Sequence, residues 1–474
     1  MLITIENFGA IKHFQFDTEK DLYLIFGKNS VGKSYAISLV YLIVKHILEL
    51  RDPRIFRYEM PYFFDKEFNL NIKELEEKVE KNNDKEIDIS NYVEKHLISY
   101  LNNFLVKVLN DSLINTFNDV SNLQNKFTKE ELKITLAWRN INLDIELNIE
   151  LDLKKSSSQN MELGITKFYL NKKFILKKIK TCRHSKHTEK QIILYYPDEK
   201  KEHFEKSYFM LIGKLVLDFF DELQIINNVY YLPASRSGLY QALSAFGQIF
   251  AQLANNRSFI SKSIQLPAIS EPVADYFLHL SNINTSRKKH DDFIDYANDI
   301  EKEILQGVVE FDSKNKKLFF TPNETSLKLD LSATSSMVSE ISPIVSYLKY
   351  IFPIQRTSKK QQKPLVFIEE PEAHLHPETQ VKLMAVFARL VKDNKIKLVM
   401  TSHSNYIFNK ASNLVIDNKI DKEKFEAILF ESTLEGSVAR NLDTDEYGIE
   451  DDNFIDTAES IYEEKLELIN KLNS

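Results

Sequence analysis

Apolar runs bounded by polar or glycine residues mark the strands and helices that this chain is expected to form. Residues 22–26 are a continuous apolar run, and residues 35–44 form a longer apolar segment just beyond it. Two further runs, at 363–368 and 397–400, each lead into polar residues. Short continuous runs are typical of strands buried on both faces of a sheet, whereas the longer segment has the length of a helix. The pattern therefore predicts an α/β fold with buried strands.

The long stretch between these runs shows both periodicities. Residues 66–135 place apolar side chains at helical spacing, without the uninterrupted heptads of a long coiled-coil arm. Residues 141–153 alternate strictly between apolar and polar, which predicts a strand or hairpin with one wet face. The other elements expected, in chain order, are a turn at 154–160, strands at 167–170 and 191–196, a helix at 208–223, helices within 240–305 and a β-meander at 308–331.

A phosphate-binding motif lies between the first apolar run and the helix-length segment. Residues 27–34 fit the pattern G-x-x-x-x-G-K-[ST], whose glycines let backbone N–H groups surround a phosphate at a helix N-terminus. We expect Lys33 to contact the β- and γ-phosphates and the Ser34 hydroxyl to bind Mg²⁺. The alternative, an ordinary glycine turn, is disfavoured by the flanking strand and helix. The predicted nucleotide-binding residues are Gly27, Lys28, Asn29, Ser30, Val31, Gly32, Lys33, Ser34 and Tyr35.

Two adjacent carboxylates follow the apolar run at 363–368. A strand that ends in Glu369 and Glu370 has the form of a Walker B element, in which one acid binds Mg²⁺ and the other orients or deprotonates the attacking water. Because consecutive strand residues point to opposite faces, we assign Glu369 to the metal and Glu370 to the water. The run at 397–400 leads to His403, which can hydrogen-bond a γ-phosphate or the water. The alternative is a strand that ends in surface acids.

Spacing and local sequence together resemble one family. Ser34 and Glu369 are 335 residues apart (369 − 34), which is too far for a compact P-loop switch protein. The matching segments are EEPEAHLHP at 369–377, TSHS at 401–404, the opening strand at 2–11 and YLPASRSG at 231–238. They resemble the OLD-like ATPases (overcoming lysogenization defect), relatives of the SMC and DNA-repair ABC ATPases. The resemblance covers residues 1–50 and about 226–417, and does not extend to 51–225.

This resemblance implies an α/β P-loop head of the ABC type, a mixed sheet with flanking helices, that carries a large α+β insertion. The expected units are the N-terminal part of the head (1–50), the insertion (51–225), the C-terminal part of the head (226–420), and a C-terminal strand and helical tail (421–474). The insertion is left without catalytic duty, so we expect it and the tail to form the surface that recognises an effector.

The resemblance also implies a homodimer or higher homo-oligomer in which each ATP site is completed by the partner's signature segment. Ser335 and Ser336 are the candidates for this role in trans. Met337 stands where relatives commonly carry glycine, and it removes the close backbone approach that glycine permits. Slow hydrolysis or incomplete dimer closure is therefore an expectation. The alternative is a helix cap with no role in trans.

Two histidine-containing segments are weaker candidates for a metal site. His374 and His376 occupy the HLH position of the family's own loop, which disfavours a separate metal site there. Cys182, His184 and His187 offer only three ligands in a basic stretch, so a solvated loop is favoured over zinc. The lysine-rich run 172–190 could bind a phosphate backbone, but a solvated face is favoured.

Composition and charge narrow the function. The 474-residue chain has a net charge of −7, one Cys and no evident signal sequence or membrane-length apolar stretch, which predicts a cytoplasmic protein without disulfides. Only 71 residues follow His403 (474 − 403), which disfavours the Toprim nuclease of many OLD-like relatives. The resemblance implies an ATPase that uses ATP and Mg²⁺ and regulates a separately encoded effector in anti-phage defence. The alternatives are an ATP-gated scaffold with little hydrolysis and a chromosome or DNA-repair ATPase, and nucleic acid stays open as a partner.

Overall fold

The computed structural model describes the larger part of the chain. The described residues are 1–50, 74–75, 77–78, 86–118, 123–125, 127–128, 130–140, 145–155, 161–179, 186–187, 191–197, 208, 213, 226–242, 269–283, 285, 293–314, 316–352, 362–450, 462–466 and 468–469. Among them, no helix combines the length and the apolar character that crossing a membrane requires.

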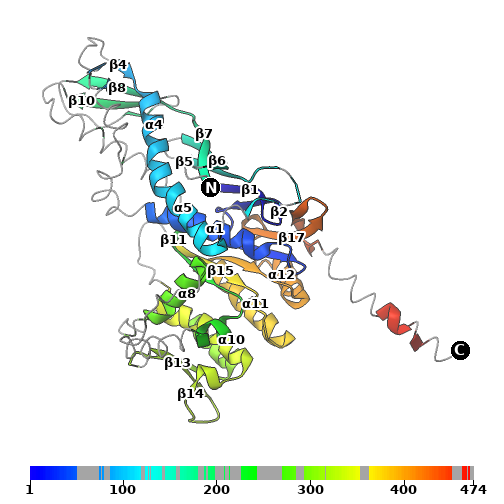
Figure 1. Cartoon of the computed structure of the whole chain (residues 1–474). Coiled ribbons are helices and arrows are strands. Elements are labelled where there is room, and N and C mark those ends of the chain that lie inside the picture. The colour runs from blue at the N-terminus through cyan, green and yellow to red at the C-terminus, as the bar shows by residue number, and fades with distance from the viewer. Residues whose placement is uncertain are drawn as a thin grey trace, which may run out of the picture.

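A large mixed sheet organises the described part of the chain (Figure 1). Its eleven described strands lie in the order β11-β15-β16-β3-β17-β18-β2-β1-β5-β6-β7. The first five are parallel: β11 (Ile226–Leu232), β15 (Lys363–Glu369), β16 (Lys397–Thr401), β3 (Leu22–Gly27) and β17 (Phe425–Thr433). The others are β18 (Gly436–Leu442), β2 (Ile11–Asp17), β1 (Leu2–Phe8), β5 (Lys133–Asn140), β6 (Ile145–Lys155) and β7 (Met161–Leu170), of which β18 pairs with β2 in parallel and the rest are antiparallel to their neighbours.

Apolar clusters bury both faces of the central strands, which is why these strands read as continuous apolar runs. Along β3, Tyr23 and Ile25 belong to one cluster, while Leu24 and Phe26 belong to the other. The first cluster contains α1 (Lys33–Leu50), and the second contains α11 (Pro377–Lys392) and α12 (Asn405–Ile416). The predicted α/β fold class, a P-loop head with a mixed sheet and flanking helices, is confirmed.

The remaining helices and small sheets of the head pack around the second cluster. The helices are α8 (Glu271–Ser281), α9 (Ile294–Ile300) continued by η7 (Glu301–Leu305), η8 (Leu331–Ala333), and α10 (Ser336–Ser346) continued by η9 (Tyr347–Ile351). The short η10 (Lys422–Lys424) buries no residue and directly precedes β17. The predicted meander is confirmed as β12 (Gly307–Asp312), β13 (Lys317–Pro322) and β14 (Leu329–Asp330). A short hairpin of β19 (Thr444–Asp445) and β20 (Gly448–Ile449) follows the last strand of the main sheet.

A projecting arm rises from the head (Figure 1). It consists of α4 (Ser90–Leu101), the π-helical η2 (Asn102–Val106) and α5 (Lys107–Phe117), which follow one another without a break in helical backbone. A small sheet of β4 (Glu86–Asp88), β8 (Lys173–Ile179), β10 (Gln191–Pro197) and β9 (Lys186–His187) lies at its far end. Helical spacing at 66–135 therefore predicted α4 and α5 correctly, but it was wrong for β4 and for the start of β5, whose periods are too short to dominate that window.

Strands from the expected insertion and from beyond residue 420 belong to the main sheet. The part of the alternating segment 141–153 that the structure describes, residues 145–153, is confirmed as part of β6, which buries Leu147, Ile149 and Leu151 on one face and pairs between β5 and β7. Residues 141–144 lie outside the described residues. β17 lies beside β3 in parallel register. The expected domain limits, 51–225 for the insertion and 420 for the end of the head, stay proposals. The main sheet contains strands from inside the expected insertion and from beyond residue 420. The helices expected within 240–305 are present at 240–242 and as α8, α9 and η7, and residues 243–268 lie outside the described residues. Of the helices expected at 208–223 and in the tail, residues 208, 213, 462–466 and 468–469 are helical. The rest lie outside the described residues.

Candidate nucleotide site

Three parallel strands bring the predicted site residues to one edge of the sheet. β3 pairs with β16, and β16 pairs with β15, all in the same direction. Because the carboxyl ends of parallel strands meet at a common edge, the phosphate loop, His403 and the paired acids are neighbours. Ser34 and Glu369 are separated by 335 positions (369 − 34) in sequence, yet the Ser34 hydroxyl donates to Glu369 Oε2 over 3.2 Å.

The phosphate loop has the backbone conformation that its sequence requires. Gly27 and Gly32 have φ of +142° and +93°, a region that favours glycine. A side chain at Gly27 would place its Cβ 2.7 Å from the carbonyl oxygen of Phe430 in β17. Lys33, which begins α1, is only 6% exposed, and its Nζ donates to the carbonyls of Gly27 and Lys28 over 2.9 Å each. Hydrogen bonds to the loop's own carbonyls therefore hold the lysine inside the loop.

Glu369 lies where a metal ligand is needed. Its two carboxylate oxygens are contacted by the hydroxyls of Ser34 and of Tyr231 from β11. Burial is the largest influence on Glu369 and raises the pKa of its carboxyl. Mg²⁺ prefers oxygen ligands and commonly uses one or two carboxylates together with substrate phosphates. The adjacent hydroxyl and carboxylate oxygens of Ser34 and Glu369 fit that donor set.

Glu370 is separated from Glu369 by a break in the strand rather than by alternation along it. β15 ends at Glu369, and Glu370 has φ of +41°, outside the strand conformation. The guanidinium of Arg236 holds this turn, since it donates to the carbonyls of Glu369 (2.7 Å) and Glu370 (3.2 Å). The Glu370 carboxylate then lies 3.5 Å from His403 Nε2. The two acids do face different neighbours, but the physical reason given from the sequence was wrong.

A lysine–histidine contact links the phosphate loop to the end of β16. Lys33 Nζ lies 3.0 Å from His403 Nε2, and the ammonium can only donate, so the imidazole nitrogen accepts. Burial lowers the pKa of Lys33 to about 8, although Glu370, Glu372 and Glu369 act in the opposite sense. Burial and the Lys33 charge both lower the pKa of His403, which favours its neutral form at neutral pH.

Glu372 was not singled out from the sequence, yet it orients His403. Its Oε1 accepts hydrogen bonds from the Ser402 hydroxyl (2.8 Å) and from the His403 backbone N–H (2.7 Å). Burial raises the pKa of the Glu372 carboxyl. Glu372 lies in an irregular loop, where neither helical nor strand periodicity indicates direction. Only its place in the family-like EEPEAH sequence could have drawn attention to it.

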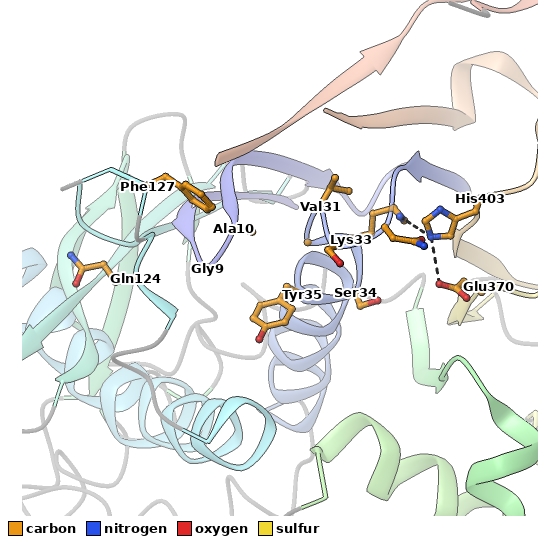
Figure 2. A pocket seen from close by; sticks show the side chains of 13 residues that line it. Gly9, Ala10, Val31, Lys33, Ser34, Tyr35, Gln124, Phe127, Glu370 and His403 are labelled. Atoms are coloured by element: carbon orange, nitrogen blue, oxygen red, sulfur yellow. Dashed lines mark hydrogen bonds and ion pairs between the residues drawn. The ribbon is translucent and has the colours of Figure 1, made fainter. Parts of the chain in front are cut away.

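A cavity of about 800 Å³ joins these groups to the insertion (Figure 2). Its volume lies within the range of small-molecule sites. Glu370 and His403 line one part of it, and Gln124 and Phe127, from the insertion, line another. These two residues were not predicted, because the insertion was expected to have no duty at the nucleotide site. The cavity lining is Gly9, Ala10, Asn29, Ser30, Val31, Gly32, Lys33, Ser34, Tyr35, Gln124, Phe127, Glu370 and His403.

The predicted signature serines form a helix cap away from this cavity. Ser335 is the N-cap of α10, its hydroxyl accepts from the N–H of Val338, and both Ser335 and Ser336 are exposed. Neither serine lines the cavity of its own chain. Met337 packs against the second apolar cluster, so its side chain has a place in the core.

α10 is nevertheless connected to the paired acids through one buried ion pair. Glu340 of α10 and Arg236 are both essentially inaccessible, with Arg236 Nη2 3.4 Å from Glu340 Oε2. Glu340 Oε1 also accepts from the Ser237 hydroxyl over 2.7 Å. Arg236 thus holds the turn after β15 and the helix that begins at Ser336 in one network. The YLPASRSG segment contains both Arg236 and Ser237.

The structure describes the weaker candidates from the sequence only in part. His376 caps α11, His374 is exposed, and the described residues contain no cluster of metal-ligating side chains. Cys182 and His184 lie outside the described residues, as does the side chain of His187. In the lysine-rich run, Lys172 is buried and Lys177 pairs with Glu86 over 2.5 Å, so these two do not offer free charge to a phosphate backbone.

Comparison with known proteins places the chain in one family. The model of the family described as "AAA ATPase domain" matches residues 1–408. None of the curated proteins matches the chain. Similar solved structures include an SMC head bound to the C-winged helix domain of ScpA (9% identity, 93% of this chain and 96% of that chain, TM-score 0.39). Others are the SMC head domain from Thermotoga maritima (10%, 93% and 98%, 0.32) and an SMC head with an extended coiled coil bound to the C-terminal domain of ScpA, from Pyrococcus furiosus (11%, 98% and 98%, 0.37).

Proposed function

This chain belongs to the AAA ATPase domain family, and on that premise we propose that it binds MgATP and hydrolyses it to ADP and phosphate. The observation that supports the proposal most directly is the meeting of Ser34 with Glu369, and of Lys33 with His403, across the sheet edge. The first pair joins the phosphate loop to the end of β15, and the second joins it to the residues that follow β16. A nucleotide-hydrolysing site needs acidic and hydrogen-bonding groups at these positions beside the phosphates.

In the proposed reaction, Lys33 neutralises the β- and γ-phosphates at the N-terminus of α1. Glu370 accepts a proton from a water molecule whose oxygen attacks the γ-phosphorus, and the bond from that phosphorus to the bridging oxygen breaks to release ADP. Ser34 and Glu369 hold Mg²⁺, which supplies positive charge next to the phosphates when bound. His403, oriented by Glu372, hydrogen-bonds the γ-phosphate or the water.

At the finer level, we propose that two heads dimerise around two nucleotides and that the nucleotide state regulates a separately encoded effector in an OLD-like anti-phage system. The exposed cap of α10, Ser335 and Ser336, is the candidate that completes the partner's site. An ATP-gated scaffold with little hydrolysis is the second candidate, supported by the side chain of Met337 where a glycine would permit closer approach. A chromosome or DNA-repair ATPase is a third alternative, which Met337 does not favour.

The test is steady-state ATPase activity of the full chain, measured with and without the product of the adjacent gene. Lys33→Ala should abolish tight ATP binding, and Glu370→Gln should bind MgATP but hydrolyse it at least ~100-fold more slowly, since a general base contributes about that much. Glu370→Gln should also accumulate an ATP-dependent dimer, visible by light scattering.

Two outcomes separate the levels of this proposal. Near-normal ATP affinity in Lys33→Ala would remove Lys33 from the site and overturn the nucleotide assignment. A negligible rate of ATP hydrolysis, both for the chain alone and with the product of the adjacent gene, would favour the scaffold if ATP still binds tightly. Glu369→Gln serves as the internal comparison, because it should weaken the Mg²⁺ dependence rather than the proton transfer.

A further inference from the structure

The cavity extends well beyond the part that phosphates occupy. Lys33, Ser34, Glu370 and His403 define the phosphate end, and the lining continues past the β1–β2 turn to Gln124 and Phe127 (Figure 2). In Figure 2, Phe127 lies beside Gly9 and Ala10, on the side of the phosphate loop opposite His403. If the γ-phosphate faces Glu370, the nucleoside must extend in the direction of Phe127.

Phe127 presents an aromatic face to solvent at this place. Its side chain is 64% exposed, although a large apolar residue gains from burial. The cavity also contains Tyr35, which is 44% exposed, but its ring already contacts two other rings, with centroids 4.9 Å from Phe117 and 6.1 Å from Phe8. An exposed aromatic side chain in a nucleotide cavity offers the surface on which a base stacks.

A buried asparagine fixes the backbone that carries Phe127. Asn125 is 2% exposed, and its Oδ1 accepts from the Phe127 N–H over 2.8 Å. The Asn125 Nδ2 donates to the Glu435 carbonyl in the β17–β18 turn, and the Asn125 N–H donates to the Asn7 carbonyl in β1. This junction joins segments that are more than a hundred residues apart in sequence.

The junction also depends on close backbone approach. Gly436 has φ of +117°, and a side chain there would place its Cβ 2.8 Å from the Ala10 carbonyl oxygen and 2.9 Å from Asn125 Nδ2. The Gly9 N–H donates to the Leu123 carbonyl on the other side of the same turn. The Phe127 segment is therefore anchored to the head at several points, directly beside the phosphate loop.

We propose that Phe127 is the platform on which the base of the bound nucleotide stacks, so that the insertion supplies the base-binding end of the site. This inference rests on the proposed nucleotide function and deepens it. Every base has an aromatic face, so Phe127 contributes affinity for nucleotides generally. A bound nucleotide would then contact the insertion directly.

The experiment compares two ligands that differ in the base. Binding of MgATP and of magnesium tripolyphosphate to the full chain is measured by calorimetry for the unaltered protein, Phe127→Ala and Tyr447→Ala. Tyr447 is a matched exposed aromatic residue (80% exposed) that does not line the cavity. We expect Phe127→Ala to weaken ATP binding about tenfold or more, the effect typical of losing one stacked base, and to leave tripolyphosphate binding unchanged. Tyr447→Ala should change neither.

A second variant guards against loss of folding. Phe127→Trp should keep ATP affinity, and its fluorescence should change with ATP but not with tripolyphosphate, against the background of the single buried Trp138. Unchanged ATP affinity in Phe127→Ala, or equal weakening of both ligands, would overturn the inference while leaving the nucleotide function standing. If the unaltered protein binds neither ligand, the proposed function fails and this inference fails with it.

Discussion

At the scale of single residues, Lys33 combines burial with a cluster of carboxylates. Its ammonium is enclosed by the phosphate loop and approached by His403, Glu369, Glu370 and Glu372. Desolvation disfavours the charged form, which is why the pKa of Lys33 falls to about 8 from an ordinary value of 10.5. A phosphate-binding lysine with such a pKa changes its charge within an accessible range of pH.

ATP affinity should therefore fall as the pH rises through about 8. Below this pH the free protein already carries a charged Lys33; above it, binding must take up a proton, because the bound phosphates favour the ammonium. At pH 9 the dissociation constant should be roughly tenfold higher than at pH 7. Calorimetry at several pH values, in two buffers with different ionisation enthalpies, measures both the affinity and the proton uptake.

His403 does not confuse this measurement, since its lowered pKa keeps it neutral over the whole alkaline range. An ATP affinity that is constant between pH 7 and 9.5, without proton uptake, would show that Lys33 keeps its charge in the free protein.

At the scale of elements, the turn after β15 and α10, which begins at the candidate signature serines, form one unit. Arg236 donates to the carbonyls of Glu369 and Glu370, and it pairs with Glu340 in α10. A shift of α10 would thus be transmitted to the backbone that orients Glu370. Glu340 and Arg236 are both buried, so removing the Glu340 carboxylate leaves the Arg236 charge buried without a neutralising partner.

Glu340→Gln should lower both stability and turnover. Breaking a buried ion pair typically costs about 3–5 kcal/mol of stability. The glutamine amide should preserve part of the hydrogen bonding, so we expect a smaller loss that still lowers the melting temperature measurably. The ATP turnover number should fall at least ~10-fold at a temperature where the protein is folded, with ATP affinity unchanged, because Glu370 is misplaced by the loosened turn.

Glu301→Gln is the matched control for this prediction. Glu301 is also buried, and it pairs with Lys349 over 2.6 Å, but it does not contact the paired acids. It should lower the melting temperature without a comparable effect on turnover. If Glu340→Gln behaves in the same way as Glu301→Gln, the bridge through Arg236 is structural only.

The elements around the phosphates could be predicted from sequence, whereas the base end of the cavity could not. β3, β15 and β16 are buried on both faces, so they read as uninterrupted apolar runs that lead to recognisable polar residues. The role of Phe127 depends instead on hydrogen bonds from Asn125 to Asn7 and Glu435. These contacts have no periodicity, and they join segments that sequence distance keeps apart.

At the scale of the whole molecule, the arm begins at the nucleotide site and ends at a separate sheet. Phe117, the last residue of α5, contacts Tyr35, the residue next to Ser34, with the two rings tilted by 41° and their centroids 4.9 Å apart. The base of the arm is fixed to α1 through His46 and Ser112, whose side chains are 2.8 Å apart. From there the helical run of α5, η2 and α4 leads to the β4-β8-β10-β9 sheet (Figure 1).

This geometry makes the arm a candidate lever that reports nucleotide occupancy at its far sheet, where we propose that an effector is recognised. A ligand can shift the arm only through contacts that differ between bound and free states, and the Tyr35–Phe117 contact joins the arm to a residue that lines the cavity. Hydrogen exchange of the full-length Glu370→Gln variant, with and without MgATP, measures the response. ATP should lower hydrogen exchange in α5 and in the far sheet.

Adding Phe117→Ala should abolish the response of the far sheet while ATP still binds. The matched control is Ile114→Ala, which alters an exposed apolar residue (44%) on the same helix and should not abolish that response. A far sheet that responds equally in all three proteins would mean that the arm does not carry the signal through Phe117, and that any effector reads the nucleotide state from the head itself.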